Sequence, residues 1–486
     1  MNSNVLENLE PKLLWEQFYN ISQVPRPSKK EEKILNYLID FCKKNGVEYN
    51  QDSTGNLLLK IPASPGKEKS ITVVLQAHVD MVCEKNKDTI FDFDVDGIKL
   101  INESGWIKAD GTTLGADNGI GVAAALAIAL DKDSIHGPVE ILLTVDEETG
   151  LTGAKTISSD FVSGKVLLNL DSEEDGAFYV GCSGGIDTMG EFIPSYETSL
   201  KDFSSYELSI SGLKGGHSGL DINTGRANAI KLFARVLNGI RKLDFRIAEI
   251  NGGSKRNAIP READATILLK DDEYSEAKRI IEKYEAAFKL ENKNVDSDVK
   301  VNFKKIDKTF DKAFTRQFGE WLVDVLLGLP HGVIQLSPDI PGLVETSTNL
   351  ATVVYNNDRV FVGTSQRSSI ESSKRYIADS VRAVFVLAHA LVTTGDGYPG
   401  WKPDMDSQVL KISTDVYKKL FGSTPEVKAI HAGLECGLLG AKYPGMDMIS
   451  FGPTILGAHS PDEKVEIKSV EKFYFLLKEI LKELAQ

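Results

Sequence analysis

Three short apolar runs in the first 190 residues lead directly into acidic residues. They are ITVVLQAHVD (71–80), PVEILLTVDEE (138–148) and GKVLLNLDSEE (164–174). Unbroken apolar runs of this length are typical of strands buried on both faces, and helical patterns separate them. This alternation predicts an α/β domain in which helices flank a mixed, mostly parallel sheet.

The pattern changes between residues 190 and 395. YELSISGL (206–213), ADATILLK (263–270) and VKVNFKKI (299–306) alternate as half-exposed strands do, and residues 273–292 are typical of an amphipathic helix. The α/β pattern then returns with MDMISFG (446–452). We therefore expect a discontinuous first domain, residues 1–189 and 396–486, with an α+β domain inserted at 190–395.

Composition excludes several classes of protein. The 56 basic and 70 acidic residues give a net charge of −14 without a basic stripe, so nucleic acid is not an expected partner. The four cysteines show no CxxC spacing, which predicts a reducing compartment. Residues 1–20 indicate a helix rather than a signal peptide, and no apolar run reaches the ~20 residues of a membrane span. We expect a cytoplasmic protein that does not contact a membrane.

Candidate metal ligands follow four predicted strands of the α/β part. In open α/β sheets, ligands bind beyond the carboxyl ends of the strands, so these positions should converge. The residues are His78, Asp80, Glu147, Glu148, Asp171 and His459.

Histidine and carboxylate side chains suit Zn²⁺, Mn²⁺ or Co²⁺, and two such ions ~3.5–4 Å apart can activate one water for hydrolysis. Asp117, in TLGADNGIG (113–121), is the expected bridging carboxylate. Asp117, Glu148 and Asp171 carry three negative charges, and a bridging hydroxide balances the remaining charge of two divalent ions. The charge count therefore favours two ions over one.

Local geometry suggests roles for the neighbouring acids. Positions i and i+2 of an extended chain share a side, so Asp80 can accept the second ring N–H of His78. Adjacent Glu147 and Glu148 should point to opposite sides, so one can hold a metal while the other faces the substrate as a proton shuttle. We assign Glu148 to metal and Glu147 as the general base.

Seven motifs in this order resemble those of the di-metal peptidase superfamily that includes carboxypeptidase G and the aminoacylases. They are QAHVDMV (76–82), LGADNGIG (114–121), TVDEETGLTGA (144–154), NLDSEE (169–174), KGGHSG (214–219), RNAIP (256–260) and GAHSPDE (457–463). ISQVPRPSKKEEKI (21–34) and HAGLECGLLG (431–440) resemble the branch of aminoacyl-histidine dipeptidases, also called Xaa-His dipeptidases or peptidase D.

The resemblance implies a ligand set. His78 and Asp171 would hold one metal, Glu148 and His459 the other, and Asp117 both, with a cis peptide bond just after Asp117. Aspartate at the position of Asp171 accompanies dipeptidases and aminopeptidases in this superfamily, so the resemblance favours dipeptide substrates.

The resemblance also makes the inserted domain a lid that contributes to the site. It implies that His217 reaches the scissile carbonyl and that Asn257 and Arg367 bind the substrate carboxylate. Glu435 stands where the wider superfamily often has the aspartate of GGTDA, and we expect it to anchor the substrate amine. Relatives are often dimers, so a homodimer is compatible with the resemblance.

These observations predict a di-metal dipeptidase that hydrolyses Xaa-His dipeptides such as β-alanyl-histidine through a metal-bridging water and a Glu general base. The expected cofactors are two divalent ions, Zn²⁺ first and Co²⁺ or Mn²⁺ as alternatives. A broader dipeptidase, an N-acyl amino acid deacylase and a non-catalytic metal-bound peptide-binding protein remain alternatives. Retention of Glu147 beside a full ligand set argues against the last of these.

Two other motif matches conflict with their sequence context. Ser183 lies in a GxSxG pattern, but an extended-looking segment follows it where a nucleophile elbow needs a helix. Residues 119–124 fit GxGxxA but follow a turn instead of a strand, so their small side chains indicate close packing rather than a dinucleotide site. His389 lies in an apolar helical pattern and is expected in the core.

Overall fold

The computed structural model describes residues 5–6 and 8–486, which form two compact units. Of the described residues, the first unit contains those up to 181 together with 403–429 and 434–486, and the second contains 182–402 and 430–433. The expected lid, 190–395, falls inside the second unit. Residues 1–4 and 7, part of the predicted N-terminal helix, lie outside the described residues.

The first unit is built on an eight-stranded sheet in the order β1-β2-β6-β3-β7-β23-β8-β22. β3 runs parallel to β6 and β7, and β7 runs parallel to β23, while β1, β2 and β8 pair antiparallel. These strands are β1 (Glu48–Gln51), β2 (Leu57–Ile61), β3 (Val73–His78), β6 (Val139–Thr144), β7 (Val166–Asn169), β8 (Ala177–Cys182), β22 (Glu426–Ile430) and β23 (Asp447–Ser450). The mixed sheet with parallel central strands confirms the predicted α/β class.

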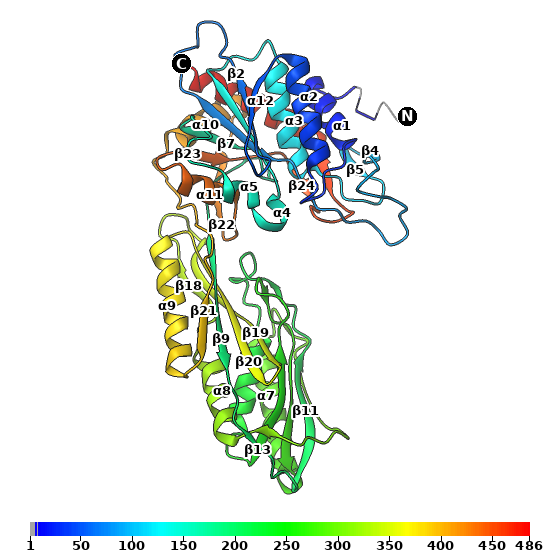
Figure 1. Ribbon diagram of the computed structural model, residues 1–486, viewed down its shortest axis with the longest axis vertical. Coiled ribbons are helices and arrows are strands. Elements are labelled where there is room, and N and C mark those ends of the chain that lie inside the picture. Colours follow the sequence, from blue (N-terminus) through cyan, green and yellow to red (C-terminus); the bar gives the residue numbers. More distant parts are fainter. Residues whose placement is uncertain (1–4, 7) are drawn as a thin grey trace. The chain divides into compact units, whose positions relative to one another are not determined.

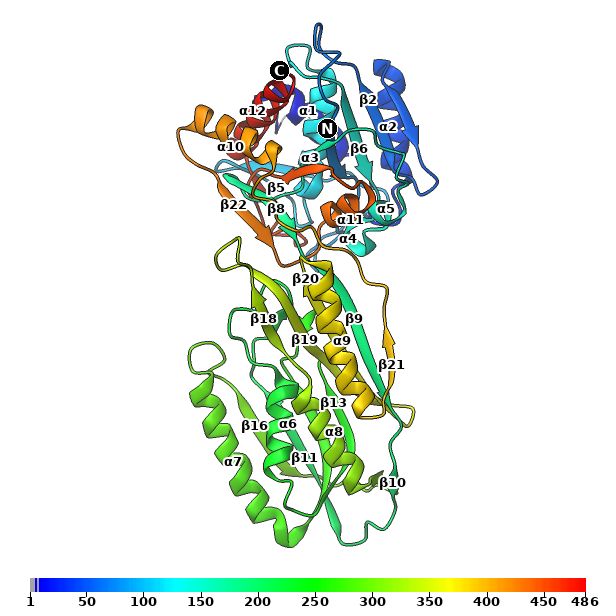
Figure 2. The same ribbon diagram turned by 90° about the vertical axis from the view of Figure 1, so that its left-hand side faces the viewer.

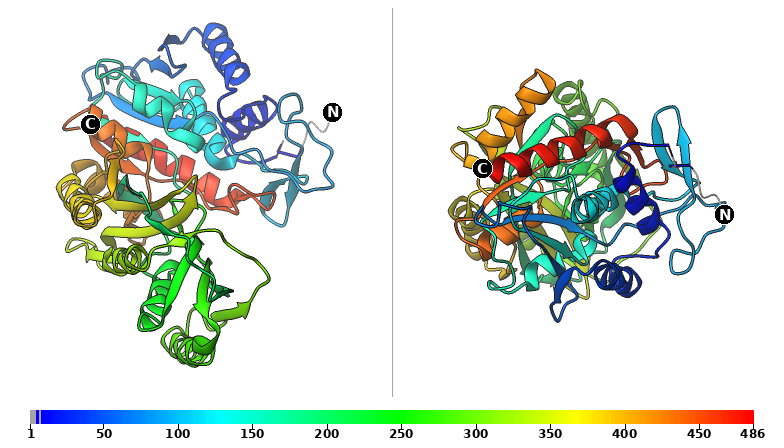
Figure 3. Two further views of the ribbon diagram at one scale, coloured as in Figure 1. Left: turned by 60° about the horizontal axis from the view of Figure 1, so that its bottom comes forward. Right: turned by 90° about the horizontal axis from the view of Figure 1, so that it is seen from above.

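Helices cover this sheet, and a smaller sheet in the order β24-β25-β5-β4 lies in the same unit (Figure 1). α1 packs on α3, and α12, red in Figure 3, packs against α3 and α10. The helices are α1 (Lys12–Ser22), α2 (Glu32–Asn45), α3 (Ala116–Leu130), α4 (Glu147–Gly150), α5 (Thr152–Thr156), α10 (Gln408–Phe421), α11 (Glu435–Lys442) and α12 (Ile467–Leu484). The small sheet contains β4 (Leu100–Glu103), β5 (Trp106–Ala109), β24 (Ile455–Leu456) and β25 (Lys464–Glu466).

The second unit is an antiparallel sheet in the order β16-β11-β15-β13-β19-β20-β9-β21, with β18 paired to β19 (Figure 2). Its strands are β9 (Gly184–Phe192), β11 (Phe203–Ser211), β13 (Phe245–Gly252), β15 (Ala263–Lys270), β16 (Lys300–Lys305), β18 (Gly332–Leu336), β19 (Val344–Asn356), β20 (Arg359–Ser368) and β21 (Leu391–Thr394). Two short pairs, β10 (Tyr196–Glu197) with β17 (Ala313–Phe314) and β12 (Gly216–His217) with β14 (Ala258–Ile259), accompany it.

Four helices bury their apolar faces in one core against this sheet, together with side chains of β9, β11, β13, β15, β19 and β20. The helices are α6 (Ala229–Gly239), α7 (Tyr274–Glu291), α8 (Arg316–Gly328) and α9 (Glu371–Leu387). In α7 only Ala277, Ile281 and Phe288 are buried, at the spacing of one helical face. This helix and the three strands that the sequence predicted here are confirmed.

Most of the other expectations about local structure are also confirmed. Ser183 lies between β8 and β9, so a strand follows it where a nucleophile elbow needs a helix. A Cβ on Gly119 would lie 2.7 Å from Arg26 Nη2, so close packing explains one small residue of the GxGxxA match.

The expectation that His389 lies in the core is wrong. His389 lies beyond the end of α9 and is exposed, and its ring centroid lies 5.4 Å from that of Trp321. None of the described helices has the length and apolar character needed to span a bilayer.

Candidate metal centre

Parallel pairing brings the predicted ligands to one edge of the first sheet. His78 is the last residue of β3, where it is the register partner of Thr144 at the end of β6. Glu147 and Glu148 begin three residues after β6, and Asp171 follows β7 by two residues. The carboxyl ends of these strands meet because β3 lies between β6 and β7.

Asp117 lies between the two histidines of the centre. Its Oδ1 lies 3.1 Å from Nε2 of His78, and its Oδ2 lies 3.1 Å from Nε2 of His459. The peptide bond from Asp117 to Asn118 is cis, as the resemblance implied. The two oxygens of one carboxylate therefore face two different imidazoles, which is the arrangement that a bridging ligand needs.

Each imidazole also faces a second carboxylate. Nε2 of His78 lies 3.3 Å from Oδ1 of Asp171, and Nε2 of His459 lies 3.0 Å from Oε2 of Glu148. Three side-chain sets in this region each place their ligand atoms within 4.8 Å of one another. They are His78–Asp117–Asp171, Asp117–Glu148–His459 and His78–Glu147–Glu148.

The donor set fits divalent metal ions. A ring nitrogen carries at most one proton, so Nε2 of His78 can donate to only one of the two carboxylates that it faces. Oε1 of Glu148 is buried and has no hydrogen-bond partner, which is costly for a carboxylate without a cation. Imidazole and carboxylate together suit Zn²⁺, Mn²⁺ or Co²⁺.

Burial and crowding of like charges shift the pKa values in this region. Burial raises the pKa of Asp171 to about 6, and burial together with Asp171, Glu435 and Glu148 raises that of Glu147 well above its usual range. Hydrogen bonds to Asp117 and Glu148 raise the pKa of His459 to about 11. Bound positive charge, from protons or metal ions, therefore stabilises the crowded carboxylates of the centre.

Asp80 contacts the far side of the His78 ring and orients it. Its Oδ1 lies 3.3 Å from Nδ1 of His78, the ring nitrogen that faces away from Asp117. The same carboxylate accepts hydrogen bonds from Ser28 Oγ at 2.8 Å and from the backbone N–H groups of Glu147 and Glu148 at 3.1 and 3.3 Å. Asp80 therefore links His78 to the start of α4. The spacing in the sequence predicted its contact with His78 but not its contact with α4.

The orientation expected for the adjacent glutamates is wrong in one respect. Glu147 and Glu148 are the first residues of α4, not part of an extended segment, because Asp146 adopts a left-handed φ of +50° and starts a helical turn. Both carboxylates consequently reach the region of His78. Which of the two serves as a ligand is therefore not decided by alternation along a strand.

In the second unit, His217 presents one ring nitrogen as a donor. Its Nδ1 accepts the backbone N–H groups of Gly219 at 3.3 Å and Leu220 at 3.2 Å, so the proton of the neutral ring belongs on Nε2. Burial and the charge of Arg367 lower the pKa of His217, which favours that neutral form. His217 is the register partner of Ala258, the residue after Asn257.

Arg367 is a buried cation without an anionic partner. It lies on β20 with 7% of its surface exposed, and its Nη1 donates to the Tyr398 hydroxyl at 2.9 Å. Over residues 5–6 and 8–486, no carboxylate oxygen lies within 4.0 Å of its guanidinium, and its Nε has no hydrogen-bond partner. Arg367 and Asn257 line the same cavity of about 300 Å³. A buried unpaired guanidinium indicates an anionic ligand.

Glu435 is the first residue of α11 and is fully buried in the first unit. Its Oε2 accepts hydrogen bonds from Gln76 Nε2 at 2.6 Å and Thr144 Oγ1 at 2.7 Å, while Oε1 has no partner. Burial raises its pKa to about 7. The structure thus places Glu435 beneath the strand ends, bonded to residues of β3 and β6.

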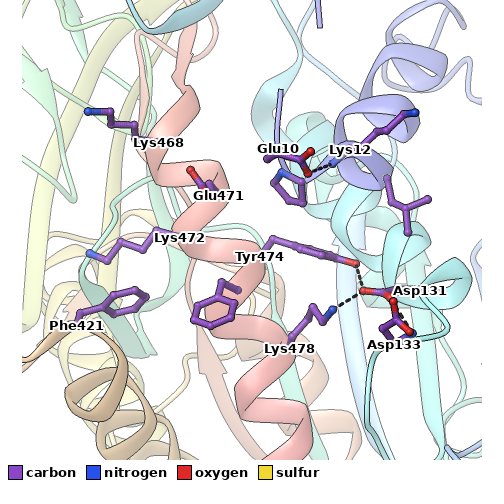
Figure 4. Close-up of a pocket in the computed structure, with 13 residues that line it drawn as sticks. Glu10, Lys12, Asp131, Asp133, Phe421, Lys468, Glu471, Lys472, Tyr474 and Lys478 are labelled. Atoms are coloured by element: carbon purple, nitrogen blue, oxygen red, sulfur yellow. Dashed lines mark hydrogen bonds and ion pairs between the residues drawn. The ribbon is translucent and has the colours of Figure 1, made fainter. Parts of the chain in front are cut away.

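A hollow of about 850 Å³ in the first unit is lined by none of the predicted site residues (Figure 4). Its acidic Asp131 is already bonded to Lys478 at 2.6 Å and to the Tyr474 hydroxyl at 3.3 Å. We therefore assign the chemistry to the strand-end cluster.

Sequence reasoning assigned no role to several residues that contact the site. Arg26 and Ser28 lie in ISQVPRPSKKEEKI, and Glu463 closes GAHSPDE, so all three stood inside recognised motifs. Tyr398 lies in a loop outside those motifs. Only the tertiary contacts of these four residues reveal which groups they hold in place.

Comparison with known proteins shows which family the chain belongs to. Residues 74–483 match the model of peptidase family M20/M25/M40. The chain belongs to this family. As a member of the M20 family it is a hydrolase that cleaves peptide bonds.

Two relatives are similar over almost the whole chain. The cytosol non-specific dipeptidase of Escherichia coli K12 is 42% identical over 481 residues, which cover 99% of each chain. The crystal structure of aminoacylhistidine dipeptidase from Vibrio alginolyticus has a TM-score of 0.92 and 41% identity, covering 99% of this chain and 98% of that one. Aminopeptidase PepT from Bacillus cereus, at 17% identity and a TM-score of 0.57, shares the fold.

Proposed function

We propose that this M20 peptidase is a two-metal dipeptidase that hydrolyses Xaa-His dipeptides such as β-alanyl-histidine. The observation that carries the proposal is the carboxylate of Asp117, whose two oxygens face His78 and His459. The two relatives named as dipeptidases, one of them an aminoacylhistidine dipeptidase, support the substrate class. The name of the first relative and the cysteine pattern support a cytoplasmic location, and the homodimer remains a proposal from resemblance.

The ligands would be His78 and Asp171 for one ion, Glu148 and His459 for the other, and Asp117 for both. We propose zinc, which this donor set accepts. Bound metal would polarise the scissile carbonyl and make water more acidic.

The chain's own groups would move the protons. Glu147, at the start of α4, would take a proton from the attacking water and deliver it to the leaving amine. The Nε2–H of His217 would donate a hydrogen bond to the carbonyl oxygen as negative charge develops on it.

Three further residues would bind the two ends of the dipeptide. Arg367 and Asn257 would hold its carboxylate, a role that the unpaired guanidinium of Arg367 supports. Glu435, whose Oε1 has no partner, would bind its amine.

The proposal predicts chelator-sensitive cleavage of β-alanyl-histidine. Removing metal should abolish hydrolysis, and Zn²⁺ or Mn²⁺ should restore it, because the carboxylates of the centre need cations. The assay is release of free amino acids from a panel of dipeptides, β-alanyl-histidine among them, and N-acetyl amino acids. Cleavage of N-acyl amino acids alone would favour a deacylase, and no cleavage with two ions bound would favour a peptide-binding protein.

Replacing His217 with alanine should lower kcat by about 10²- to 10³-fold, because an oxyanion contact forms mainly in the transition state. KM should change far less. Steady-state kinetics measures both, with His389→Ala, an exposed histidine of the same unit, as the control. A rise in KM at unchanged kcat would contradict the assigned role.

A further inference from the structure

Glu463 is a buried carboxylate that the proposed chemistry does not use. Its Oε2 accepts the N–H groups of Leu114 at 2.7 Å and Gly115 at 2.9 Å, and its Oε1 accepts those of Ala116 at 2.7 Å and Asp117 at 3.2 Å. These N–H groups lie at the start of α3, where the helix supplies no carbonyl groups to accept their hydrogen bonds. One side chain therefore anchors the whole segment that ends in Asp117.

Glu463 belongs to the same turn as His459. The turn connects β24 to β25, which pair antiparallel, and Glu463 is its last residue before β25. His459 adopts a left-handed φ of +63° in this turn. The carboxylate of Glu463 thus joins the turn that carries one histidine ligand to the segment that carries Asp117.

Arg26 binds backbone carbonyl groups near the centre, as Glu463 binds backbone N–H groups. The fully buried guanidinium donates from Nη1 to the carbonyls of Val79 and Asp80 at 3.0 Å each, and from Nη2 to the carbonyl of Gly115 at 2.5 Å. A side chain on Gly115 would lie 2.5 Å from Nη2, so only glycine fits there. Arg26 consequently joins the segment after His78 to the segment before Asp117.

We infer that Glu463 and Arg26 are positioning residues that set the spacing of three ligand-bearing segments, 78–80, 114–117 and 459–463, and so the metal affinity of the centre. Asp117 lies 3.1 Å from both histidines, so a small shift of segment 114–117 would alter both distances, and a shift of either histidine segment would alter one. Charge-assisted hydrogen bonds to backbone groups are short and directional, which suits them to fix loops. This inference rests on the proposed two-metal centre.

The decisive variant is Glu463→Gln, tested by Co²⁺ titration of the metal-free protein. Glutamine offers one oxygen and one NH₂ group, so two of the four N–H groups would face a donor. We expect the ion held by Asp117, Glu148 and His459 to bind about 10- to 100-fold more weakly, with altered Co²⁺ absorption bands. Asp462→Asn is the matched control because it removes the same charge from the exposed neighbouring residue, and it should bind as the wild type does.

A purely structural role would give a different result. Glu463→Gln protein that melts at a lower temperature yet binds two Co²⁺ ions with wild-type affinity and spectrum would overturn the inference. If Glu463→Gln does not fold, Arg26→Lys provides the test, because lysine keeps the charge but lacks the guanidinium fork that contacts three carbonyls. It should also weaken Co²⁺ binding about tenfold or more, and unchanged affinity would refute the inference. Wild-type protein that binds no Co²⁺ would instead refute the metal centre itself.

Discussion

Replacing Glu147 with glutamine should lower kcat by about 10³- to 10⁴-fold while the protein retains its metal. Loss of a positioned general acid–base costs up to about 10⁴-fold, and here one carboxylate would serve both proton transfers. The size and shape of the side chain are preserved, so binding of substrate should change little. Steady-state kinetics and metal analysis of the same preparation measure the two quantities.

Metal analysis of this variant also decides between the two adjacent glutamates. Glu147 and Glu148 both reach the region of His78, so a loss of one ion in Glu147→Gln would make Glu147 a ligand rather than the base. The control is Glu471→Gln, an exposed position on α12 outside the centre. Turnover close to that of the wild type would contradict the assignment.

Replacing Asp117 with alanine should have the largest effect on metal binding. Changing a residue that only orients a ligand costs about 10- to 100-fold in affinity, so removing a carboxylate that faces both histidines should exceed that range. Hydrolysis should become undetectable at metal concentrations that saturate the wild type. Metal analysis after gel filtration and a Zn²⁺ titration of the activity provide the readouts.

Asp110→Asn is the control for this variant, because it removes a carboxylate from an exposed position seven residues earlier in the chain. It should retain wild-type metal content and activity. Two tightly bound ions in Asp117→Ala would show that Asp117 does not bridge the centre, and the ligand set would have to be reassigned.

The sequence allowed prediction of the fold class and of the residues that gather at the sheet edge. Buried strands carry a continuous apolar run, and each run ended in a candidate ligand, so β3, β6 and β7 and their polar ends could be placed together. The spacing of His78 and Asp80 also predicted their contact, because alternation along an extended chain is a local property.

Features that depend on local backbone conformation were harder to predict. The left-handed φ of Asp146 starts α4 and turns Glu147 and Glu148 toward the same region, which an extended segment would not do. His389 follows an apolar helical pattern, yet α9 ends before it and leaves the ring exposed against Trp321. Helix ends respond to packing and backbone strain that periodicity does not report.

The sequence by itself determined which side chains could bind metal and roughly where each would lie along the sheet edge. Each predicted strand and the polar residues at its end are neighbours in the chain, so both can be recognised locally. Only the tertiary structure decided how those side chains are held. Glu463 is 346 residues from the N–H group of Asp117 that it accepts, and Arg26 is 89 residues from the carbonyl of Gly115. Such contacts satisfy buried backbone groups, and that requirement exists only once the chain has folded.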